Sequence, residues 1–540
     1  MKDPVDRYGH PARVEAEGHG AARAEGSRTP PAASDRSLSL WIETTPSTDF
    51  PSLRGDVEAD VAIVGAGITG ITAAYLLARE GQSVVLVDKG RIAMSETGHT
   101  TAHVVGTTDA DYGELIEVHG EDGARTDVEA IGSAIGLMRS LVAELEIDCG
   151  FEPRDGYLYA EDEADREYLE RQQESLGRAG IETEWTADVP VPFETIGGLR
   201  HRDQHVVHVR QYLLAIAAAA RRHGAQIFEN SLVDEVQNAQ RDGHCVARSE
   251  GGSLRARHLL LATHVPLADR GSLWAKMHAT RTYVVAAPIA PGRLGDALFW
   301  DTADPYHYTR LLDTAEGPYL IVGGEDRDVG KEGNDPQRYR ALERYCRERF
   351  GVTTFTHRWS GQINEPADML PFIGESSHGE NVWMATGYSG TGLTYGTLAA
   401  MLLTDFALER ENPYARLYDP TRKKLGSMLA TVVTKATELS KRVIEKVTGL
   451  DVEASRVADV AEGEGKIVAA GGAKHAVARI DGELRALDPA CTHMGCTVSW
   501  NAAEKSWDCP CHGSRFDSCG AVLNGPATAP LARPEGALPE

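Results

Sequence analysis

Residues 60–88 read DVAIVGAGITGITAAYLLAREGQSVVLVD, and this stretch decides the fold of the larger part of the chain. An apolar run at 61–64 leads into a glycine turn with GxGxxG spacing, and a helix-forming segment follows at 71–80. A second apolar, β-branched run at 83–87 ends at Asp88. The spacing predicts the strand–turn–helix–strand unit of an α/β fold that binds a dinucleotide.

The three glycines of the turn are Gly65, Gly67 and Gly70. They permit a tight turn and a close backbone approach to a pyrophosphate group, which the helix N-terminus faces. Asp88 is expected to bind ribose hydroxyl groups. By itself this pattern does not separate NAD from FAD.

A second informative stretch lies near the other end, where five of the eight cysteines fall between positions 491 and 519. It reads CTHMGC at 491–496 and CPCHGS at 509–514, so each half offers cysteine together with histidine. Two thiolates and two neutral imidazoles are typical of a Rieske [2Fe–2S] centre. A Cys2His2 zinc site is the competing interpretation, but zinc fingers pair cysteine with cysteine and histidine with histidine at wider spacings.

These motifs resemble the soluble Rieske domains of respiratory and photosynthetic cytochrome complexes. The resemblance implies four cluster ligands, Cys491, His493, Cys509 and His512. It also implies a disulfide between Cys496 and Cys511, and a loop at 525–527 that covers the cluster. A disulfide is unusual in a cytoplasmic protein, and shielding beside a cluster would let it persist.

Two further positions bear on the redox potential, which hydrogen bonds to the cluster sulfurs tune. Ser514 matches a serine that donates such a bond in high-potential family members. Phe516 stands where those members carry a tyrosine whose hydroxyl group supplies another. We therefore expect a potential below the upper end of the Rieske range of roughly −150 to +300 mV.

Three later motifs indicate which dinucleotide binds: WSG at 359–361, DMLPFIG at 368–374 and ATGYSGTGLT at 385–394. They resemble the closing motifs of the D-amino-acid oxidase-like family of FAD oxidoreductases, over roughly residues 39–420. The resemblance implies a Rossmann-type FAD-binding domain with an antiparallel-sheet substrate domain, followed here by the small all-β Rieske domain. It implies these FAD-binding residues: Gly65, Gly67, Gly70, Asp88, His99, Thr100, Thr101, Val233, Gly387, Gly390, Thr391, Gly392, Leu393 and Thr394.

His99 lies in the stretch SETGHTTAH at 95–103, where chains of this family pass the flavin. Some members, the dimethylglycine dehydrogenases, attach FAD covalently to a histidine in this stretch, so His99 is a candidate for such a bond. A polar contact with non-covalent FAD is the alternative. Val233 matches the family position beside adenine, and 390–394 would bring a second helix N-terminus to the flavin ring.

The substrate in this family lies over the flavin and against the antiparallel sheet. Candidate residues in that region are Tyr306, His307 and Arg310, and Arg310 could clamp a carboxylate with two parallel hydrogen bonds. Ordinary strand residues are an equally good interpretation of the three. We find no decisive catalytic base, which suits hydride transfer from a neutral amine that is held in position.

The expected reaction is oxidation of a C–N bond in an amine or amino acid, with electrons passing from FAD to the cluster and on to an external acceptor. Flow in reverse from a donor protein, a non-catalytic electron-transfer protein, and an oxidase whose cluster is structural or regulatory are alternatives. A Rieske oxygenase would also need a mononuclear iron site held by two histidines and a carboxylate in its own catalytic domain. In this chain the residues outside the Rieske domain are accounted for by the flavin fold, which argues against such a catalytic domain.

We expect four segments: a disordered lead-in at 1–38, the FAD oxidoreductase at 39–420, an amphipathic linker helix at 421–450 and the Rieske domain at 451–540. The linker alternates apolar and basic residues at helical spacing. This pattern fits a helix packed on the protein body or one lying on a membrane surface.

Bulk properties restrict the partners. The net charge of −25 argues against nucleic acid, whose phosphates would be repelled. No run of eighteen apolar residues occurs, so we expect no transmembrane segment. The first residues lack the apolar core of a signal peptide, and a cytoplasmic location is expected.

Overall fold

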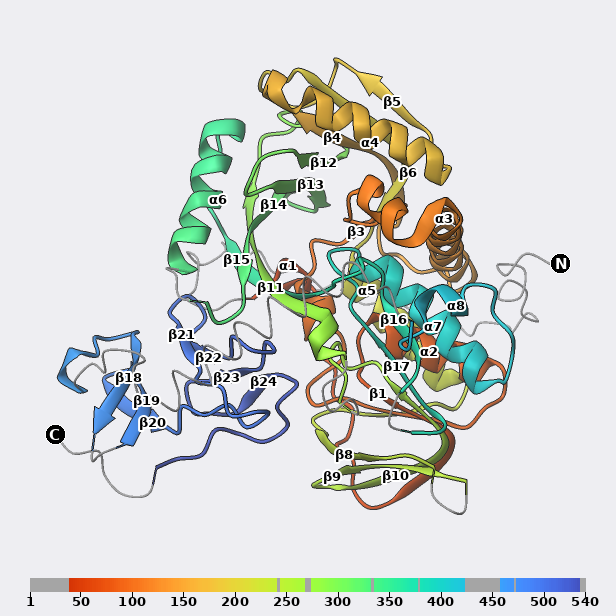
Figure 1. Ribbon diagram of the computed structural model, residues 1–540, viewed down its shortest axis with the longest axis vertical. Coiled ribbons are helices and arrows are strands. Elements are labelled where there is room, and N and C mark those ends of the chain that lie inside the picture. Colours follow the sequence, from red (N-terminus) through yellow and green to blue (C-terminus); the bar gives the residue numbers. More distant parts are fainter. Residues whose placement is uncertain are drawn as a thin grey trace.

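The computed structural model describes residues 38–239, 243–267, 273–331, 335–376, 379–422, 457–470 and 473–534. The predicted lead-in at 1–38 and linker helix at 421–450 fall almost wholly outside these residues. Figure 1 shows three parts: a nucleotide-binding α/β part, a large antiparallel sheet above it, and a small β domain in blue at the side. Within the described residues no helix is long and apolar enough to span a membrane.

The nucleotide-binding part is built on an eight-stranded sheet in the order β16-β17-β10-β1-β2-β7, with β9 on β10 and β8 on β9. The strands from β17 to β7 run parallel, as predicted from the strand–turn–helix–strand pattern. The strands are β1 (Val57–Val64), β2 (Val84–Val87), β7 (Gln226–Phe228), β8 (Val233–Gln237), β9 (Cys245–Ser249), β10 (Gly252–Leu261), β16 (Phe372–Glu375) and β17 (Val382–Thr386).

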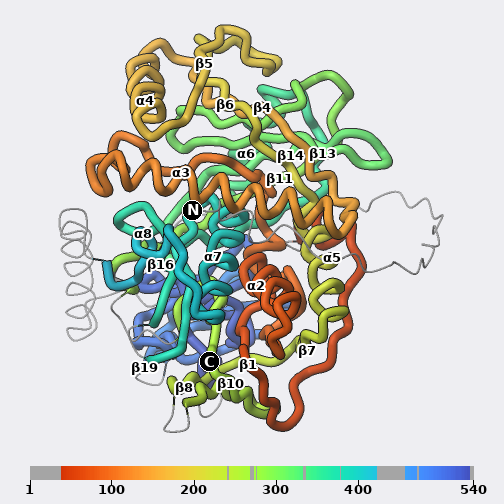
Figure 2. The backbone as a smooth tube through the Cα atoms, turned by 90° about the vertical axis from the view of Figure 1, so that its right-hand side faces the viewer, coloured from red at the N-terminus to blue at the C-terminus, as the bar shows by residue number. Residues whose placement is uncertain are grey.

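Three helices lie side by side over one face of this sheet, and the Rieske domain lies behind them in Figure 2. They are α2 (Ile68–Arg79), α5 (Val209–Arg222) and α7 (Gly392–Ala407). α2 is buried from Ile68 to Ala78 because it packs on the sheet, on α5 and on α7. A helix that is buried on nearly every side has no polar face. The glycine turn that leads into α2 is therefore held rigidly at the edge of the sheet.

The second part is a nine-stranded sheet in the order β15-β11-β14-β13-β12-β4-β6-β3, with β5 on β6. All its pairs are antiparallel except β12 with β4. The helix α6 (Asp335–Phe350) packs against β11 and β14. The strands are β3 (His103–Val104), β4 (Glu152–Ala160), β5 (Thr183–Thr186), β6 (Gly197–Val206), β11 (Met277–Pro288), β12 (Leu298–Asp301), β13 (His307–Thr314), β14 (Gly317–Asp328) and β15 (His357–Pro366).

The segment at 111–180, which the sequence predicts to be helical, contains a strand as well. It forms α3 (Tyr112–Glu144), then β4, then α4 (Arg166–Ala179). β4 pairs with β6 on one side and β12 on the other, so long-range pairing decides its structure. Two short helices, α1 (Leu40–Glu43) and α8 (Ala415–Tyr418), complete this part of the chain.

The C-terminal part is all-β, as the resemblance implies. One sheet contains β18 (Gly465–Ala470), β19 (Ala473–Ile480) and β20 (Glu483–Leu487). The other contains β21 (Ser499–Asn501), β22 (Ser506–Asp508), β23 (Arg515–Asp517) and β24 (Val522–Asn524). Trp507 and Phe516 lie opposite each other on β22 and β23, at the centre of a small core that belongs to the C-terminal part alone.

Candidate functional site

A cavity lies where the three parts meet. Its walls include the glycine turn after β1, residues at the N-terminal end of α7, and strands of the antiparallel sheet. The Rieske domain supplies the remaining wall through Val522, Gly525, Ala527 and Thr528. The flavin part and the Rieske domain therefore share one cavity.

The dinucleotide end of this cavity is made of backbone. Gly65 has a φ of +109°, and a Cβ there would overlap the carbonyl oxygen of Ala262. A Cβ at Gly70 would overlap the carbonyl oxygen of Gly65, so α2 packs directly on the turn. Gly67 is the N-cap of α2 and offers no capping side chain. A pyrophosphate group fits this helix N-terminus, where positive partial charge gathers.

Asp88 follows β2 directly and is oriented by the same turn. Its Oδ2 accepts a hydrogen bond from the Ala66 N–H at 2.6 Å, and its Oδ1 accepts one from the Gly90 N–H at 2.7 Å. Burial raises the pKa of Asp88, although both backbone bonds act to lower it. The carboxylate lines the cavity, where the dinucleotide fold uses such a group for ribose.

The other predicted FAD residues divide into two groups. The lining includes His99, Thr100, Thr101, Val233, Gly390, Gly392 and Leu393. Four others lie behind it: Gly70, Gly387, Thr391 and Thr394. Thr394, for example, donates to the carbonyl group of Val105 at 3.2 Å, which ties α7 to the loop beyond β3. The carbonyl group of His99 accepts from the indole of Trp359 at 2.9 Å, which gives the WSG motif a structural role.

Asp109 is a lining residue that carries no sequence motif. A Cβ at Gly390 would overlap its carboxylate, so this glycine admits Asp109 to the N-terminus of α7. The Gly390 N–H bonds to that carboxylate, and the Thr391 hydroxyl donates to it at 3.4 Å. Burial raises the pKa of Asp109 to about 6 against the effect of the Gly390 bond, and nearby Glu365 adds to the rise. The N-terminus of α7, which we expect to face the flavin ring, therefore has the carboxylate of Asp109 beside it.

Tyr306 is the one predicted substrate residue that lines the cavity. It keeps 36% of its surface exposed, and its hydroxyl donates to Asp326 at 3.1 Å. His307 is absent from the lining. Its Nδ1 lies 2.8 Å from Asp301, and its ring stacks on Tyr345 at 3.9 Å.

Arg310 is turned away from the cavity, so the expectation that it clamps a substrate carboxylate is wrong. It is 2% exposed, and its guanidinium donates to the carbonyl groups of Ala102 and Leu311 at 2.6 and 3.0 Å. Burial lowers its pKa to about 9. The side chain ties β13 to the loop before β3.

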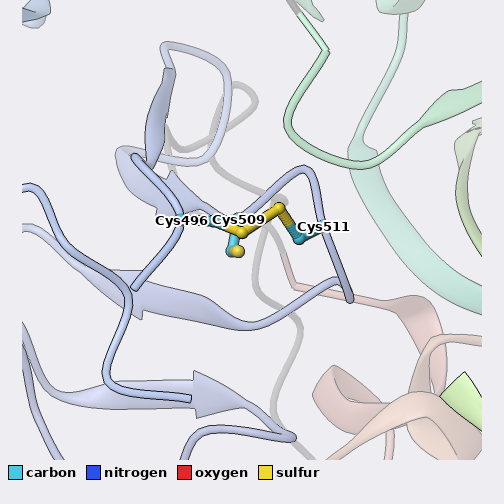
Figure 3. A group of neighbouring side chains, drawn as sticks. All are labelled: Cys496, Cys509 and Cys511. Atoms are coloured by element: carbon cyan, nitrogen blue, oxygen red, sulfur yellow. A yellow bond between two sulfur atoms is a disulfide. The ribbon is translucent and has the colours of Figure 1, made fainter. Parts of the chain in front are cut away.

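The cysteine cluster contains a bonded pair and a free thiol. The sulfur atoms of Cys496, Cys509 and Cys511 lie within 4.8 Å of one another, as Figure 3 shows. A disulfide with an S–S distance of 2.06 Å joins Cys496 to Cys511 and the two cysteine-rich loops to each other. Of these three sulfurs, only that of Cys509 is free to bind a metal.

The donor atoms fit a [2Fe–2S] cluster. Cys491 and Cys509 share a hydrogen bond that lowers the pKa of the Cys491 thiol and raises that of Cys509, and bonds from the His493 backbone and Ser514 also act to lower the pKa of Cys491. The rings of His493 and His512 meet at 4.9 Å between centroids. The Nδ1 of His493 is buried and has no hydrogen-bond partner among the described residues, so its lone pair is available to iron.

The histidine edge of this site faces the flavin part of the molecule. The indole of Trp274, just before β11, lies edge-on to His493 and to His512, each at 5.8 Å between ring centroids. Trp274 is 4% exposed. The two predicted histidine ligands therefore contact the body of the oxidoreductase, and both are half-buried.

Buried charges connect the two domains around this contact. Glu504 of the Rieske domain accepts hydrogen bonds from Arg281 of β11, from Ser360 of β15 and from Arg515 of its own domain. The side chains of Arg281, Glu504 and Arg515 are only 5 to 6% exposed. Removing one partner of a buried ion pair costs about 3–5 kcal/mol, because a charge is left unpaired. This network therefore favours one fixed arrangement of the domains.

The segment 522–528 lies between the cavity and the cluster ligands. Asn524 donates to Glu96 of the cavity wall at 2.7 Å, and Lys89 donates to the carbonyl group of Leu523. The Ala527 N–H donates to the Ser514 hydroxyl at 3.0 Å, and Ser514 in turn bonds to Cys491. One short segment thus touches the cavity on one side and reaches a cluster ligand through a single serine on the other.

The fold and the site define an oxidoreductase with two cofactors, FAD and a Rieske [2Fe–2S] cluster. The FAD dependent oxidoreductase family matches residues 60–406, and the Rieske [2Fe-2S] domain matches residues 451–535. The chain belongs to this family of D-amino-acid oxidase-like FAD oxidoreductases and carries the Rieske domain fused at its C-terminal end.

Relatives share this organisation in whole or in part. The Rieske 2Fe-2S iron-sulfur protein YhfW of Bacillus subtilis (strain 168) is 33% identical over 496 residues, which cover 91% of this chain and 96% of that protein. Gamma-glutamylputrescine oxidoreductase of Escherichia coli (strain K12) is 25% identical over 68% of this chain and 88% of its own length. The glycine oxidase structure from Geobacillus kaustophilus shares the fold, with a TM-score of 0.56 at 17% identity over 68% of this chain and 99% of that one.

Proposed function

We propose that this enzyme is a dehydrogenase that oxidises a C–N bond of an amine or amino acid and delivers the electrons through its Rieske cluster to an external acceptor. Bound FAD supplies two-electron chemistry at the substrate, and the cluster supplies one-electron transfer to the acceptor. The imine product hydrolyses in water. The similarity to gamma-glutamylputrescine oxidoreductase supports an amine nitrogen as the site of oxidation.

The cavity shared by the two domains carries this proposal. Gly65 and Gly390 lie on its flavin side, whereas Ala527 and Thr528 lie on its Rieske side. Electron transfer between two cofactors needs a short path, and a protein segment in contact with both provides one. An oxidase that passes electrons directly to oxygen has no need for such a segment.

The buried contacts between the domains support a permanent path. Arg281, Glu504 and Ser360 join the body to the Rieske domain, and Trp274 contacts both rings of the histidine pair. Such an interface suits electron transfer within one rigid molecule. The external acceptor must then approach a side of the cluster domain that the body leaves open.

The test is anaerobic reduction of the holoenzyme by a panel of amines and amino acids, followed by visible and EPR spectra. We expect flavin bleaching and then the EPR signal of a reduced Rieske cluster. In the variant Cys509→Ser the substrate should still bleach the flavin, but the EPR signal of the cluster should be absent. Its turnover rate with a one-electron acceptor such as ferric cytochrome c should fall at least tenfold.

The matched control is Cys519→Ser, which removes an exposed thiol of the same domain and should behave as the wild type. Full turnover of Cys509→Ser with the one-electron acceptor would defeat the proposed electron exit. If no amine or amino acid bleaches the flavin, the protein is an electron relay instead of a dehydrogenase.

A further inference from the structure

The end of the cavity that lies against the antiparallel sheet is lined by aromatic rings. Trp300 of β12, Tyr306 and Tyr308 at β13, and His103 of β3 all belong to the lining. The ring of His103 lies 5.8 Å from that of Trp300 and 5.8 Å from that of Tyr308. Tyr306 and Tyr308 are also 5.8 Å apart, so the four rings form one continuous aromatic wall.

Negative charge lies beside this wall. Asp109 is on the lining, and its charge is felt at the hydroxyl groups of both Tyr306 and Tyr308. Behind Tyr306, the Oδ2 of Asp326 accepts a hydrogen bond from the tyrosine hydroxyl. The Oδ1 of Asp326 is buried with no hydrogen-bond partner among the described residues. Aromatic faces with a carboxylate beside them form the arrangement that proteins use to bind organic cations.

Within the described ranges, no arginine or lysine side chain lies on this part of the lining, although the charge of Arg310 behind it is felt at His103. Among the described residues that line the cavity there is no arginine, and the lysine, Lys89, lies at the dinucleotide end with its ammonium on the Rieske domain. Arg310 is committed to backbone carbonyl groups. Burial lowers the pKa of His103 to about 3 and also lowers that of His264, which disfavours the charged form of each ring. An α-carboxylate would therefore contact neither arginine nor lysine on this part of the described lining.

We propose that the substrate is an amine without a carboxylate on the reacting carbon, which binds as its ammonium ion between this aromatic wall and Asp109 and passes the ammonium proton to Asp109 before the C–N bond is oxidised. This inference rests on the proposed function, because it names the substrate class of the same cavity. Tyr306 is placed to contact the alkyl groups of the cation, and Asp109 is placed to pair with its charge. An amino acid would lose affinity because its carboxylate would be desolvated beside Asp109 with no partner.

The first experiment compares substrates that differ only by the carboxylate: pentane-1,5-diamine against lysine, and benzylamine against phenylglycine. We expect the amine of each pair to reduce the flavin of the holoenzyme anaerobically at least tenfold more efficiently. Faster reduction by the amino acids would overturn the inference and leave the proposed dehydrogenase intact.

The second experiment measures binding without turnover. Tetramethylammonium has no nitrogen lone pair and so cannot be oxidised as an amine, and tert-butanol is a neutral molecule of similar size. Calorimetry should show that the cation binds and the alcohol does not. The variant Asp109→Asn should lower the affinity for the cation at least tenfold. The matched control Asp313→Asn removes an exposed acid from the far end of β13 and should leave binding unchanged.

The two experiments separate the two claims. If no compound reduces the flavin but tetramethylammonium binds in an Asp109-dependent way, the dehydrogenase proposal fails and the cation site stands. If tetramethylammonium does not bind, or binds Asp109→Asn equally well, the cation site is refuted whatever the flavin does.

Discussion

The two ends of the shared cavity are built in different ways. The glycine turn of the dinucleotide end comes from one continuous stretch, β1 to Asp88, and Val233 joins its lining from another part of the chain. The substrate end comes from strands far apart in the chain, and side chains make the contacts: His103, Asp109, Trp300, Tyr306 and Tyr308. The turn for the pyrophosphate is therefore a local property of the sequence, whereas substrate choice depends on how the antiparallel sheet closes over the flavin part.

A substitution at Gly65 should have the largest effect. Gly65→Ala places a Cβ onto the carbonyl oxygen of Ala262 at a φ of +109°. We therefore expect the affinity for FAD to fall at least a hundredfold. The flavin absorbance that remains after gel filtration measures this. Gly81→Ala, in the same unit, has a φ of +83° but open space around its Cβ, so it should keep FAD and lose only about 1–2 kcal/mol of stability. Equal loss of FAD in both variants would show that backbone strain, and not close packing, sets the dinucleotide end.

The domain interface should give the next largest effect, because it completes the cavity. Arg281→Met leaves Glu504 with one fewer buried cation, and we expect about 3 kcal/mol lower stability in urea unfolding. Arg248→Met breaks an exposed pair with Glu235, and its cost should stay below about 1 kcal/mol. If the two variants unfold alike, the buried network does not hold the domains together.

The substrate end should respond to pH. Asp109 has a pKa raised to about 6 by burial, and it faces Glu365, Tyr306, Tyr308, Asp326 and the N–H of Gly390. A cation binds its ionised form, so affinity is full above pH 6 and falls up to tenfold per pH unit below it. Tetramethylammonium titrations from pH 5 to 8 check this, and the slope should vanish in Asp109→Asn. A slope that persists in that variant would assign the titration to one of the other carboxyl groups.

The smallest effect is expected at the cluster. Phe516 is fully buried in the Rieske core, and Phe516→Tyr would supply the hydroxyl group that high-potential relatives carry. We expect the midpoint potential to rise within the Rieske range of roughly −150 to +300 mV. An EPR-monitored redox titration measures it, and Phe516→Leu is the control that alters packing without adding a donor. A wild-type potential already at the top of the range would contradict the expectation.

Prediction from sequence succeeded where residues close together in the chain act together. The glycine turn, Asp88 and the parallel strands around them follow from local spacing, and the all-β C-terminal part follows from the resemblance of its two short motifs to Rieske domains. It failed at β4, whose strand pairing depends on β6 and β12, and at Arg310, whose guanidinium meets a loop some 200 residues earlier in the chain. Asp109 was missed because a single acidic residue in a loop carries no pattern.

The sequence by itself determined the two cofactors. Each is held by short motifs whose residue types and spacing already contain the chemistry, glycine backbone for a dinucleotide and paired cysteine and histidine for iron. Only the tertiary structure decided that segment 522–528 connects the two sites, that Trp274 contacts the histidine ligands and that the carboxylate of Asp109 lies at the N-terminus of α7. These contacts join residues hundreds of positions apart, and their formation depends on the packing of whole sheets and not on any local pattern.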